Sequence, residues 1–314
     1  MMSTMKAVHM HAFGGPEVLV YGDAPKPEPS SREVLIRVKA VGVNPVDWKI
    51  REGGLGSLIE KKLPHILGCD VAGIVEDVGD EVTNFRSGDP VYGYIALHRD
   101  GGYAQYVVAA DTEIAHKPRI LDFLEAAAIP VGALTSWQAL VEFAKLEEDE
   151  KVLIHAASGG VGSLAVQLAK AKGAYVYGTA SERNADFVKG LGIDEFIDYN
   201  AQKFEEVVKD ADVVFDTIGG ETQTRSLEVL KKGSRLVSIV TPPSEELAEQ
   251  HGVTVGFVSV APNGGQVERM SRLFAQSKLK PHIARVMPLA EVRQAHEASQ
   301  AGHVRGKIIL HPPT

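Results

Sequence analysis

Cysteine is almost absent from this chain of 314 residues, which contains only Cys69. A single cysteine excludes a disulfide framework within the chain, and it excludes a structural zinc lobe, which needs four cysteines. The first ten residues show no basic region followed by an apolar core, so we expect no signal peptide. These absences fit a reducing compartment and predict a cytoplasmic protein.

The chain also lacks an apolar run typical of a membrane span, and it lacks an excess of positive charge. The uncharged stretch over residues 126–141 is shorter than a membrane-spanning helix and contains Pro130 and Gly132. The net charge of −8 comes from 33 basic and 41 acidic residues. This balance argues against non-specific binding to nucleic acid or to anionic membranes. The length suggests two domains.

The order of predicted elements divides the chain into a β-rich part and an α/β part. Short strands with frequent glycine, including a predicted hairpin over residues 5–20, indicate a compact barrel-like β domain. From about residue 124, helix and strand patterns alternate, which predicts a doubly wound parallel sheet. The tail, with a strand at 307–310, is expected to rejoin the first domain. The predicted domains are therefore 1–124 with 280–314, and 125–279.

A glycine-rich turn between a strand and a helix is the most informative local feature. The apolar run 152–154 reads as a buried strand, and apolar residues after Val161 recur at the spacing of one helix face. Between them Ala157, Gly159 and Gly162 occupy the three positions of a G-x-G-x-x-G dinucleotide fingerprint. Free amides at such a helix start suit a pyrophosphate. An ordinary strand-to-helix turn is the alternative, but the flanking elements favour nucleotide binding.

The residues after the next strand favour NADP(H) over NAD(H). An acid that binds the ribose of NAD is expected about 20 residues beyond the glycines. No acid closes this strand, and the chain instead offers Thr179, Ser181 and Arg183. Hydroxyls and a guanidinium suit a 2′-phosphate, which a carboxylate would repel. Glu182 offers a competing ribose contact, and Arg183 can also be read as a solvated charge.

Several motifs in order along the chain resemble one enzyme family. They are Gly42-Val-Asn-Pro-Val-Asp47, Gly68-Cys-Asp-Val-Ala-Gly73, Gly101-Gly-Tyr-Ala-Gln-Tyr-Val107, the fingerprint itself and Gly302-His-Val-Arg-Gly-Lys307. The set resembles the zinc-free medium-chain dehydrogenase/reductase superfamily in its quinone oxidoreductase, or zeta-crystallin-like, branch. The resemblance implies an α/β protein with a GroES-like β-barrel catalytic domain and a Rossmann domain. It also implies hydride transfer from NADPH to a quinone or an α,β-unsaturated carbonyl.

The resemblance further implies which residues bind the cofactor. It places Thr135 beside the nicotinamide half and Tyr199 with Ser181 and Arg183 at the adenosine phosphate. A half-buried loop tyrosine is the alternative for Tyr199. Thr217 and Val240 end later strands and are expected to contact the cofactor through their backbones. The expected pyrophosphate residues are Ser158, Gly159, Gly160, Val161 and Gly162.

The same resemblance places Asn44, Asp47 and Lys49 at the substrate cleft. Zinc-dependent relatives use a cysteine at the position of Asn44 and a histidine at the position of Cys69, so no metal is expected. Asn44 is expected to donate its amide to the acceptor oxygen, and Asp47 to orient Asn44 or a water molecule. The alternative is a turn at Asn44 with Asp47 as a helix cap. Lys49 replaces a tyrosine of some quinone reductases and can equally be an ordinary surface lysine.

Two other functions remain open from the sequence. One is a zinc-free alcohol or aldehyde dehydrogenase, for which no convincing proton acceptor is evident. The other is a nucleotide-binding structural or regulatory protein with little turnover. The apolar run 253–260 is expected to form the edge of the nucleotide-domain sheet. Because exposed apolar edges tend to be paired, we expect a homodimer through that edge.

Overall fold

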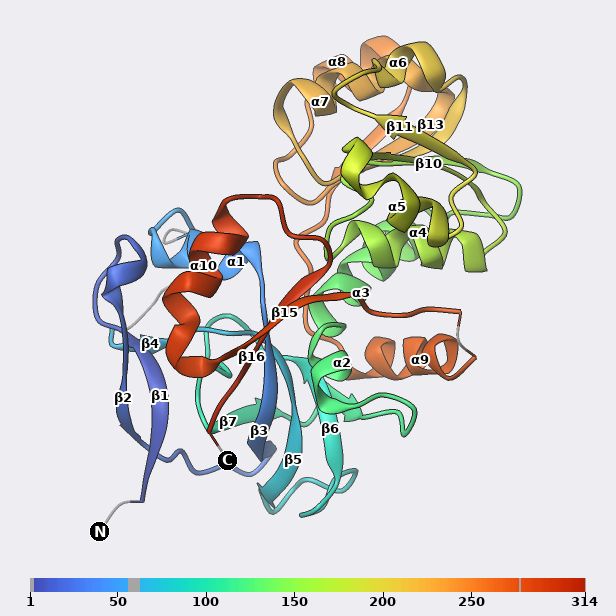
Figure 1. Ribbon diagram of the computed structural model, residues 1–314. Helices are drawn as coiled ribbons and strands as arrows, with labels where there is room; N and C mark the ends of the chain where they lie inside the picture. Colours follow the sequence, from blue (N-terminus) through green and yellow to red (C-terminus); the bar gives the residue numbers. More distant parts are fainter. Residues whose placement is uncertain (1–2, 56–62, 277, 314) are drawn as a thin grey trace. The chain divides into compact units, whose positions relative to one another are not determined.

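The computed structural model describes residues 3–55, 63–276 and 278–313. The chain forms two compact units (Figure 1): unit 1 comprises residues 1–131, 261–275 and 281–314, and unit 2 comprises 132–260 and 276–280. These units differ from the predicted domains mainly in helix α9 (Gly264–Ala275). Helix α9 packs on strands β6 (Pro90–Tyr94) and β8 (Ile114–His116) of unit 1, where the Tyr92 hydroxyl lies 2.7 Å from Ser271 Oγ.

Unit 1 is built from two sheets. The predicted hairpin is confirmed, because β1 (Thr4–Met10) and β2 (Leu19–Pro25) pair antiparallel, with β4 (His65–Ile66) on the other side of β1. The larger sheet has the order β15-β16-β3-β5-β6-β8, and β7 also pairs with β3. Its other strands are β3 (Glu33–Val43), β5 (Asp70–Val78), β7 (Tyr106–Ala110), β15 (Ile283–Pro288) and β16 (Lys307–His311). Since β16 pairs with β3, the tail rejoins the first unit as expected.

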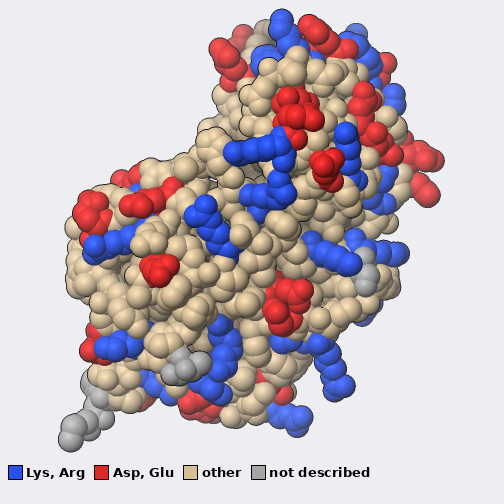
Figure 2. Space-filling view, in the orientation of Figure 1, with Lys and Arg blue, Asp and Glu red and all other residues tan. Residues whose placement is uncertain are grey.

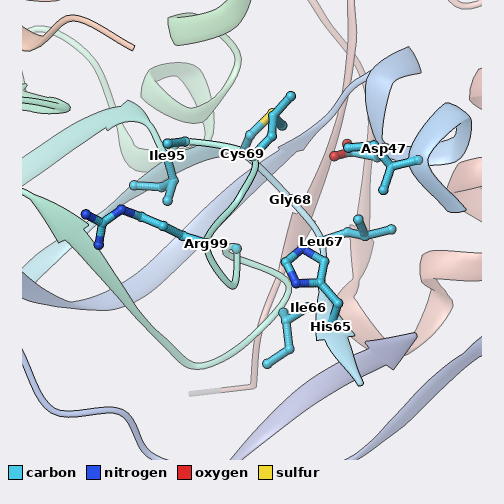
Figure 3. Close-up of a pocket in the computed structure, with 12 residues that line it drawn as sticks. Asp47, His65, Ile66, Leu67, Gly68, Cys69, Ile95 and Arg99 are labelled. Carbon is cyan, nitrogen blue, oxygen red and sulfur yellow. The ribbon is translucent and has the colours of Figure 1, made fainter. Parts of the chain in front are cut away.

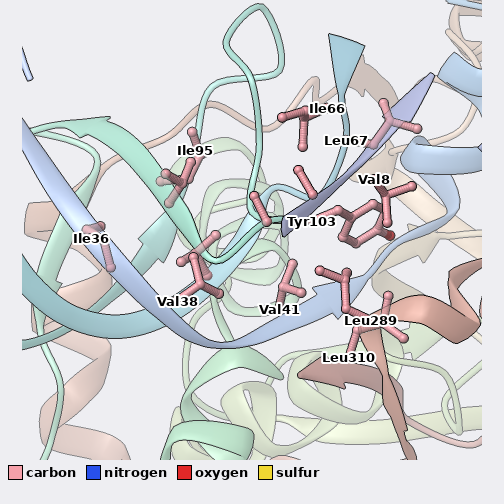
Figure 4. Packing of buried hydrophobic residues seen from close by; sticks show 14 of the residues in the cluster. Val8, Ile36, Val38, Val41, Ile66, Leu67, Ile95, Tyr103, Leu289 and Leu310 are labelled. Atoms are coloured by element: carbon pink, nitrogen blue, oxygen red, sulfur yellow. The ribbon is translucent and has the colours of Figure 1, made fainter. Parts of the chain in front are cut away.

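The core of unit 1 lies between these sheets and the helices α1 (Pro45–Arg51) and α10 (Val292–Gln300), and α2 (Phe123–Ala127) packs on β3 and β5. Strand β3 is apolar along most of its length, and most of its residues are buried. Figure 4 shows the fully buried Tyr103 ring among Val8, Leu67, Leu289 and Leu310, which come from four segments. Each such side chain contributes about 1.5–3 kcal/mol on burial, so this packing fixes where the Tyr103 hydroxyl lies.

Unit 2 contains a six-stranded parallel sheet in the order β11-β10-β9-β12-β13-β14. This is the 3-2-1-4-5-6 order of doubly wound dinucleotide-binding folds and confirms the predicted sheet. The strands are β9 (Lys151–Ile154), β10 (Tyr175–Ala180), β11 (Glu195–Asp198), β12 (Ala211–Asp216), β13 (Leu230–Ser238) and β14 (Thr254–Phe257). Helix α3 (Pro130–Trp137) begins in the last two residues of the 1–131 segment of unit 1 and continues into unit 2. The helices α4 (Gly162–Ala171), α5 (Ala185–Gly190), α6 (Phe204–Val207), α7 (Gly220–Arg225) and α8 (Glu245–His251) lie within unit 2.

The surface carries both signs of charge. On the face shown in Figure 2, basic and acidic side chains are interspersed on each unit. Within the described part of the chain, every helix is too short or too polar to cross a membrane. The mixture of charges on the face shown in Figure 2 gives no support to a uniformly basic binding face.

Candidate functional sites

The fingerprint turn in unit 2 is tightly constrained. After β9 the backbone enters the left-handed region at Ala156, with φ of 47°, and the amide of Ala157 bonds to the carbonyl oxygen of Thr179 at 2.9 Å. Helix α4 begins at Gly162, where a Cβ atom would lie only 2.2 Å from the Ala156 carbonyl oxygen. The N-cap residue Val161 makes no side-chain capping bond. The Gly159 amide bonds to the Ala156 carbonyl oxygen and the Ser163 amide bonds to the Gly159 carbonyl oxygen, so the amides of residues 160–162 between them are the ones that we expect to face a ligand.

Helix α3 supports the same turn from the side. Ser136 Oγ donates to the carbonyl oxygen of Gly132 at 2.8 Å and lies 3.4 Å from that of Val161. A Cβ atom on Gly132 would lie 2.9 Å from the Gly160 carbonyl oxygen, so the helix and the turn are in close contact. Thr135 is buried in this helix next to Ser136. Thr135 is therefore the neighbour in sequence of Ser136, which contacts the fingerprint turn, and its own contact with the nicotinamide half stays a prediction.

Thr179, a predicted cofactor residue, has internal partners. Its hydroxyl lies 3.2 Å from Nδ1 of His155 and accepts from the Ala156 amide at 3.2 Å. The other imidazole nitrogen of His155 lies 2.9 Å from Ser226 Oγ. Burial lowers the pKa of His155 to about 4, which keeps the ring neutral. His155 is thus a satisfied core histidine, and a direct cofactor contact by Thr179 stays a prediction.

Asp216 holds the loop that carries Thr217. Its carboxylate, at the end of β12, accepts from Ser238 Oγ at 2.8 Å, from Gln223 Nε2 at 3.0 Å and from two loop amides. Thr217 Oγ1 donates to the His155 carbonyl oxygen at 2.8 Å. Sequence reasoning named Thr217 but missed Asp216, which organises this loop. Val240 follows β13 and is half-buried.

The residues predicted for the adenosine phosphate come from neighbouring strand ends. Ser181 and Arg183 follow β10, and Tyr199 follows β11, which pairs with β10 in parallel. The Tyr199 side chain is 57% exposed, and its amide bonds to the Ala180 carbonyl oxygen at 3.3 Å. Carboxyl ends of parallel strands meet at one edge of a sheet, which is where such folds bind ligands.

A buried polar cluster in unit 1 surrounds Asn44. The Asn44 amide donates to Asp70 Oδ2 at 2.9 Å, and the Lys307 ammonium donates to the same oxygen at 2.7 Å. Lys307 also donates to the Asn44 carbonyl oxygen, and the Val131 amide donates to Asp70 Oδ1 at 2.6 Å. Because an ammonium can only donate, Lys307 fixes the orientation of the Asn44 amide, with its NH₂ group toward Asp70.

Asp47 lies beneath Asn44 at the end of a chain of hydrogen bonds. Its Oδ2 accepts from the backbone amide of Asn44 at 2.8 Å and from the Tyr103 hydroxyl at 2.9 Å. Tyr103 lies 3.2 Å from His296 Nε2, and His296 Nδ1 lies 3.4 Å from an Arg51 nitrogen. Burial, followed by the charge of Arg51, lowers the pKa of His296 to about 3. With the proton of the neutral His296 ring on Nε2, Arg51 donates to Nδ1, Nε2 donates to the Tyr103 hydroxyl, and that hydroxyl donates to Asp47.

Asp47 lines a small pocket (Figure 3). Among the described residues, Asp47 Oδ1 has no hydrogen-bond partner. His65, Cys69 and Arg99 also line this pocket, which has space for about one water molecule. Burial raises the pKa of Asp47 to about 6. Burial, with the charges of Asp47 and Asp70, raises the pKa of the Cys69 thiol well above its usual range.

Asp47→Asn is expected to remove a pH-dependent loss of stability. The pKa of Asp47 is about 6 in the folded protein and near 3.8 when unfolded, so the folded state binds more protons between these values. Stability is therefore highest at low pH and falls as pH rises, by about 3 kcal/mol at most from this group. Urea titrations at pH 4 and pH 8 should show that the variant gains stability relative to wild type at pH 8. An equal difference at both pH values would contradict the assignment.

Lys49 is not joined to the Asn44 cluster by any bond found in the described residues. Its ammonium lies 5.7 Å from the ring of its neighbour Trp48, and the side chain is half-buried. The catalytic role predicted for Lys49 stays a prediction. The residues that the structure adds to Asn44 and Asp47 are Asp70, Tyr103, His296 and Lys307.

The donor set around Asn44 does not suit a catalytic zinc ion. Asp70 already pairs with the Lys307 ammonium, whose charge would repel a divalent cation. Cys69 is the one thiol of the chain and lies beside Asn44, whose amide is not a usual zinc ligand. No group of three or more His, Cys, Asp or Glu side chains is arranged to hold a metal ion within residues 3–55, 63–276 and 278–313.

Comparison with known proteins gives two family matches and several full-length relatives. Residues 30–119 match the alcohol dehydrogenase GroES-like domain, and residues 191–310 match the zinc-binding dehydrogenase family. The chain is 34% identical to the chloroplastic quinone-oxidoreductase homolog of Spinacia oleracea, over 98% of this chain and 100% of that protein. It is 34% identical to a mitochondrial NAD(P)H oxidoreductase of Danio rerio, over 88% and 83% of the two chains.

The similarity extends to solved structures. The quinone oxidoreductase from Coxiella burnetii superposes with a TM-score of 0.92 at 36% identity, covering 98% of this chain and 99% of that one. A match of this extent covers both units, and it includes the GroES-like and doubly wound architectures.

Proposed function

The chain belongs to the quinone oxidoreductase branch of the medium-chain dehydrogenase/reductase superfamily and is therefore an NAD(P)H-dependent oxidoreductase. We propose that it transfers hydride from NADPH to a quinone or an α,β-unsaturated carbonyl without a metal. The fingerprint turn carries this proposal. It presents main-chain amides at the start of α4, and Gly162 allows the turn to lie against the helix. Bound NADPH supplies the hydride.

Unit 2 is proposed to bind the dinucleotide through the residues predicted from the sequence. The pyrophosphate binds the turn from Ser158 to Gly162, because its charge suits uncapped amides. Thr135 contacts the nicotinamide half, whereas Thr217 and Val240 hold the cofactor through their backbones. The internal hydrogen bonds of Thr179 suit a supporting position beneath the ligand.

A preference for NADPH over NADH is part of the proposal. The strand end after β10 offers Ser181 and Arg183, and Tyr199 follows the adjacent strand. A phosphate accepts hydrogen bonds from hydroxyl and guanidinium groups, whereas a ribose-binding site typically supplies a carboxylate. Glu182 is the one acid in this segment, and its side chain is exposed.

In unit 1, Asn44 is proposed to bind the acceptor oxygen that gains charge. One amide proton bonds to Asp70, and the other makes only a weak contact with Cys69 Sγ at 3.6 Å. Losing that weak contact costs little free energy. The hydrogen bond that Asn44 then donates to the acceptor oxygen strengthens as negative charge builds up on that oxygen. Asp47 holds the backbone amide of Asn44, so it positions this residue. Lys49 has a proposed role in attracting the acceptor.

The test is NADPH oxidation with a panel of acceptors. We expect turnover with 9,10-phenanthrenequinone, 1,4-benzoquinone or a small enone, and none with an aldehyde. NADP⁺-dependent oxidation of alcohols without quinone turnover would instead favour an alcohol dehydrogenase. Tight NADPH binding without turnover of any acceptor would favour a structural or regulatory protein.

We also propose a homodimer formed through strand β14. This strand lies at one edge of the unit 2 sheet, and Phe257 on it is 43% exposed. Pairing with the same strand of a second copy would satisfy the edge and bury Phe257. Light scattering at micromolar concentration is expected to give about twice the chain mass of 33.7 kDa. A monomeric mass at that concentration would contradict the dimer.

A cytoplasmic location is proposed from the single cysteine, which fits a reducing compartment. Two of the relatives above carry the names of other compartments, the chloroplast and the mitochondrion. Cell fractionation with antibody detection distinguishes these locations. Recovery of the protein in an organelle fraction would overturn the proposal.

A further inference from the structure

Asn184 makes an unusual pair of contacts in unit 2. It is only 7% exposed, although it is polar and lies just before helix α5. Asparagine is a favoured capping residue, yet the Asn184 side chain does not cap this helix. Instead, its Nδ2 donates to Ser158 Oγ and to Ser181 Oγ, each at 3.2 Å. The side chain therefore connects two loops at the expense of its usual role.

The two loops are the ones expected to face the cofactor phosphates. Ser158 lies in the fingerprint turn after β9, and Ser181 follows β10 directly. Strands β9 and β10 are parallel neighbours, so their carboxyl ends lie together at one edge of the sheet. Asn184 thus links the loop predicted for the pyrophosphate to the loop predicted for the adenosine phosphate.

The direction of these hydrogen bonds sets where the serine protons point. An amide nitrogen donates but does not accept, so neither hydroxyl can direct its proton at Asn184 Nδ2. With one lone pair of each oxygen occupied by Asn184, each O–H group is directed toward another acceptor. Ser158 and Ser181 are both half-buried, so each remains partly accessible. The arrangement offers two donors from adjacent strand ends.

We propose that Asn184 is a positioning residue that makes this site selective for a phosphomonoester, the 2′-phosphate of NADPH, by holding Ser158 and Ser181 as hydrogen-bond donors. The inference rests on the proposed function and extends it. A 2′-phosphate only accepts hydrogen bonds at neutral pH, whereas the 2′-hydroxyl of NADH both donates and accepts. A site restricted to donors therefore discriminates between the two. Arg183 adds positive charge to the same segment.

The experiment compares 2′,5′-ADP with 5′-AMP by calorimetric titration, because these probes differ only in the 2′-phosphate. Asn184→Asp replaces the donor by an acceptor, so the serine protons turn toward it and its charge repels phosphate. We expect this variant to lose about 100-fold in affinity for 2′,5′-ADP and less than about 3-fold for 5′-AMP. Asn184→Ala should lose about 10-fold for 2′,5′-ADP. Asn84→Asp, which adds the same charge in unit 1, is the control and should change neither affinity.

A second variant separates positioning from a general loosening of the loops. Ser181→Ala should lower 2′,5′-ADP affinity in the wild type but have a clearly smaller effect when combined with Asn184→Ala, because the serine is then no longer held. If Asn184→Asp and Asn184→Ala weaken both probes by the same factor, or if Ser181→Ala acts independently, the inference is wrong and the proposed function stands. If the wild type binds neither probe and neither NADPH nor NADH, both fail.

Discussion

Gly162→Val is expected to abolish NADPH binding. Even the Cβ atom of an alanine at this position would lie 2.2 Å from the Ala156 carbonyl oxygen, and the next contacts are also backbone atoms. Backbone cannot rotate aside as a side chain can, so the start of α4 must move away from the turn. The amides proposed to hold the pyrophosphate would move with it. We expect a loss of more than about 100-fold in NADPH affinity and about 1–3 kcal/mol in stability.

The turn has little room to relax because Ala156 is already in the left-handed region, with φ of 47°. Such a conformation costs a non-glycine residue of order 1 kcal/mol, so further distortion is unfavourable. Calorimetric NADPH titration and urea unfolding measure the two effects. Gly190→Ala is the matched control: it lies in the same unit, a Cβ atom there meets no other atom within 4 Å, and it should be neutral. Retained NADPH affinity in Gly162→Val would exclude the turn as the pyrophosphate site.

The sequence predicted unit 2 well because its signals are local. A buried strand, a small-residue turn and a helix with regularly spaced apolar residues follow one another within about 20 residues. What periodicity could not predict is which residue takes the positive φ. The structure assigns it to Ala156, next to Ala157 at the first fingerprint position, rather than to a glycine. The link from Asn184 to Ser158 was equally hidden, because it joins two different loops.

The cluster in unit 1 was only partly predictable from the sequence. Asp47 and Arg51 are four residues apart and share one side of α1, Asn44 is the N-cap residue of that helix, and all three are buried. Lys49 is two residues from both Asp47 and Arg51 and so lies on another side of the helix, and no hydrogen bond in the described residues joins it to the Asn44 cluster. The spacing alone was therefore a usable signal against Lys49. The partners Tyr103, His296 and Lys307 follow from tertiary packing of segments 56 to 263 residues distant, which no local pattern encodes.

Lys307→Met is expected to be the most destabilising substitution in unit 1. Both partners of its ion pair with Asp70 are almost fully buried, with side-chain exposures of 6% and 0%. Removing the ammonium leaves a buried carboxylate without its counter-charge, which typically costs about 3–5 kcal/mol. Urea unfolding measures this loss. Lys6→Met, which breaks an exposed pair with Asp23, is the control and should change stability little.

The double variant Lys307→Met/Asp70→Asn separates stability from function. It neutralises both members of the pair, so it should recover much of the stability lost by Lys307→Met alone. The Asn44 carbonyl oxygen would still lack its ammonium donor, and the Asn44 amide would be free to turn. Quinone turnover should therefore remain low while NADPH affinity, which the proposal assigns to unit 2, stays close to wild type. Recovery of turnover together with stability would show that Lys307 acts only in folding and that the orientation of Asn44 does not matter for catalysis.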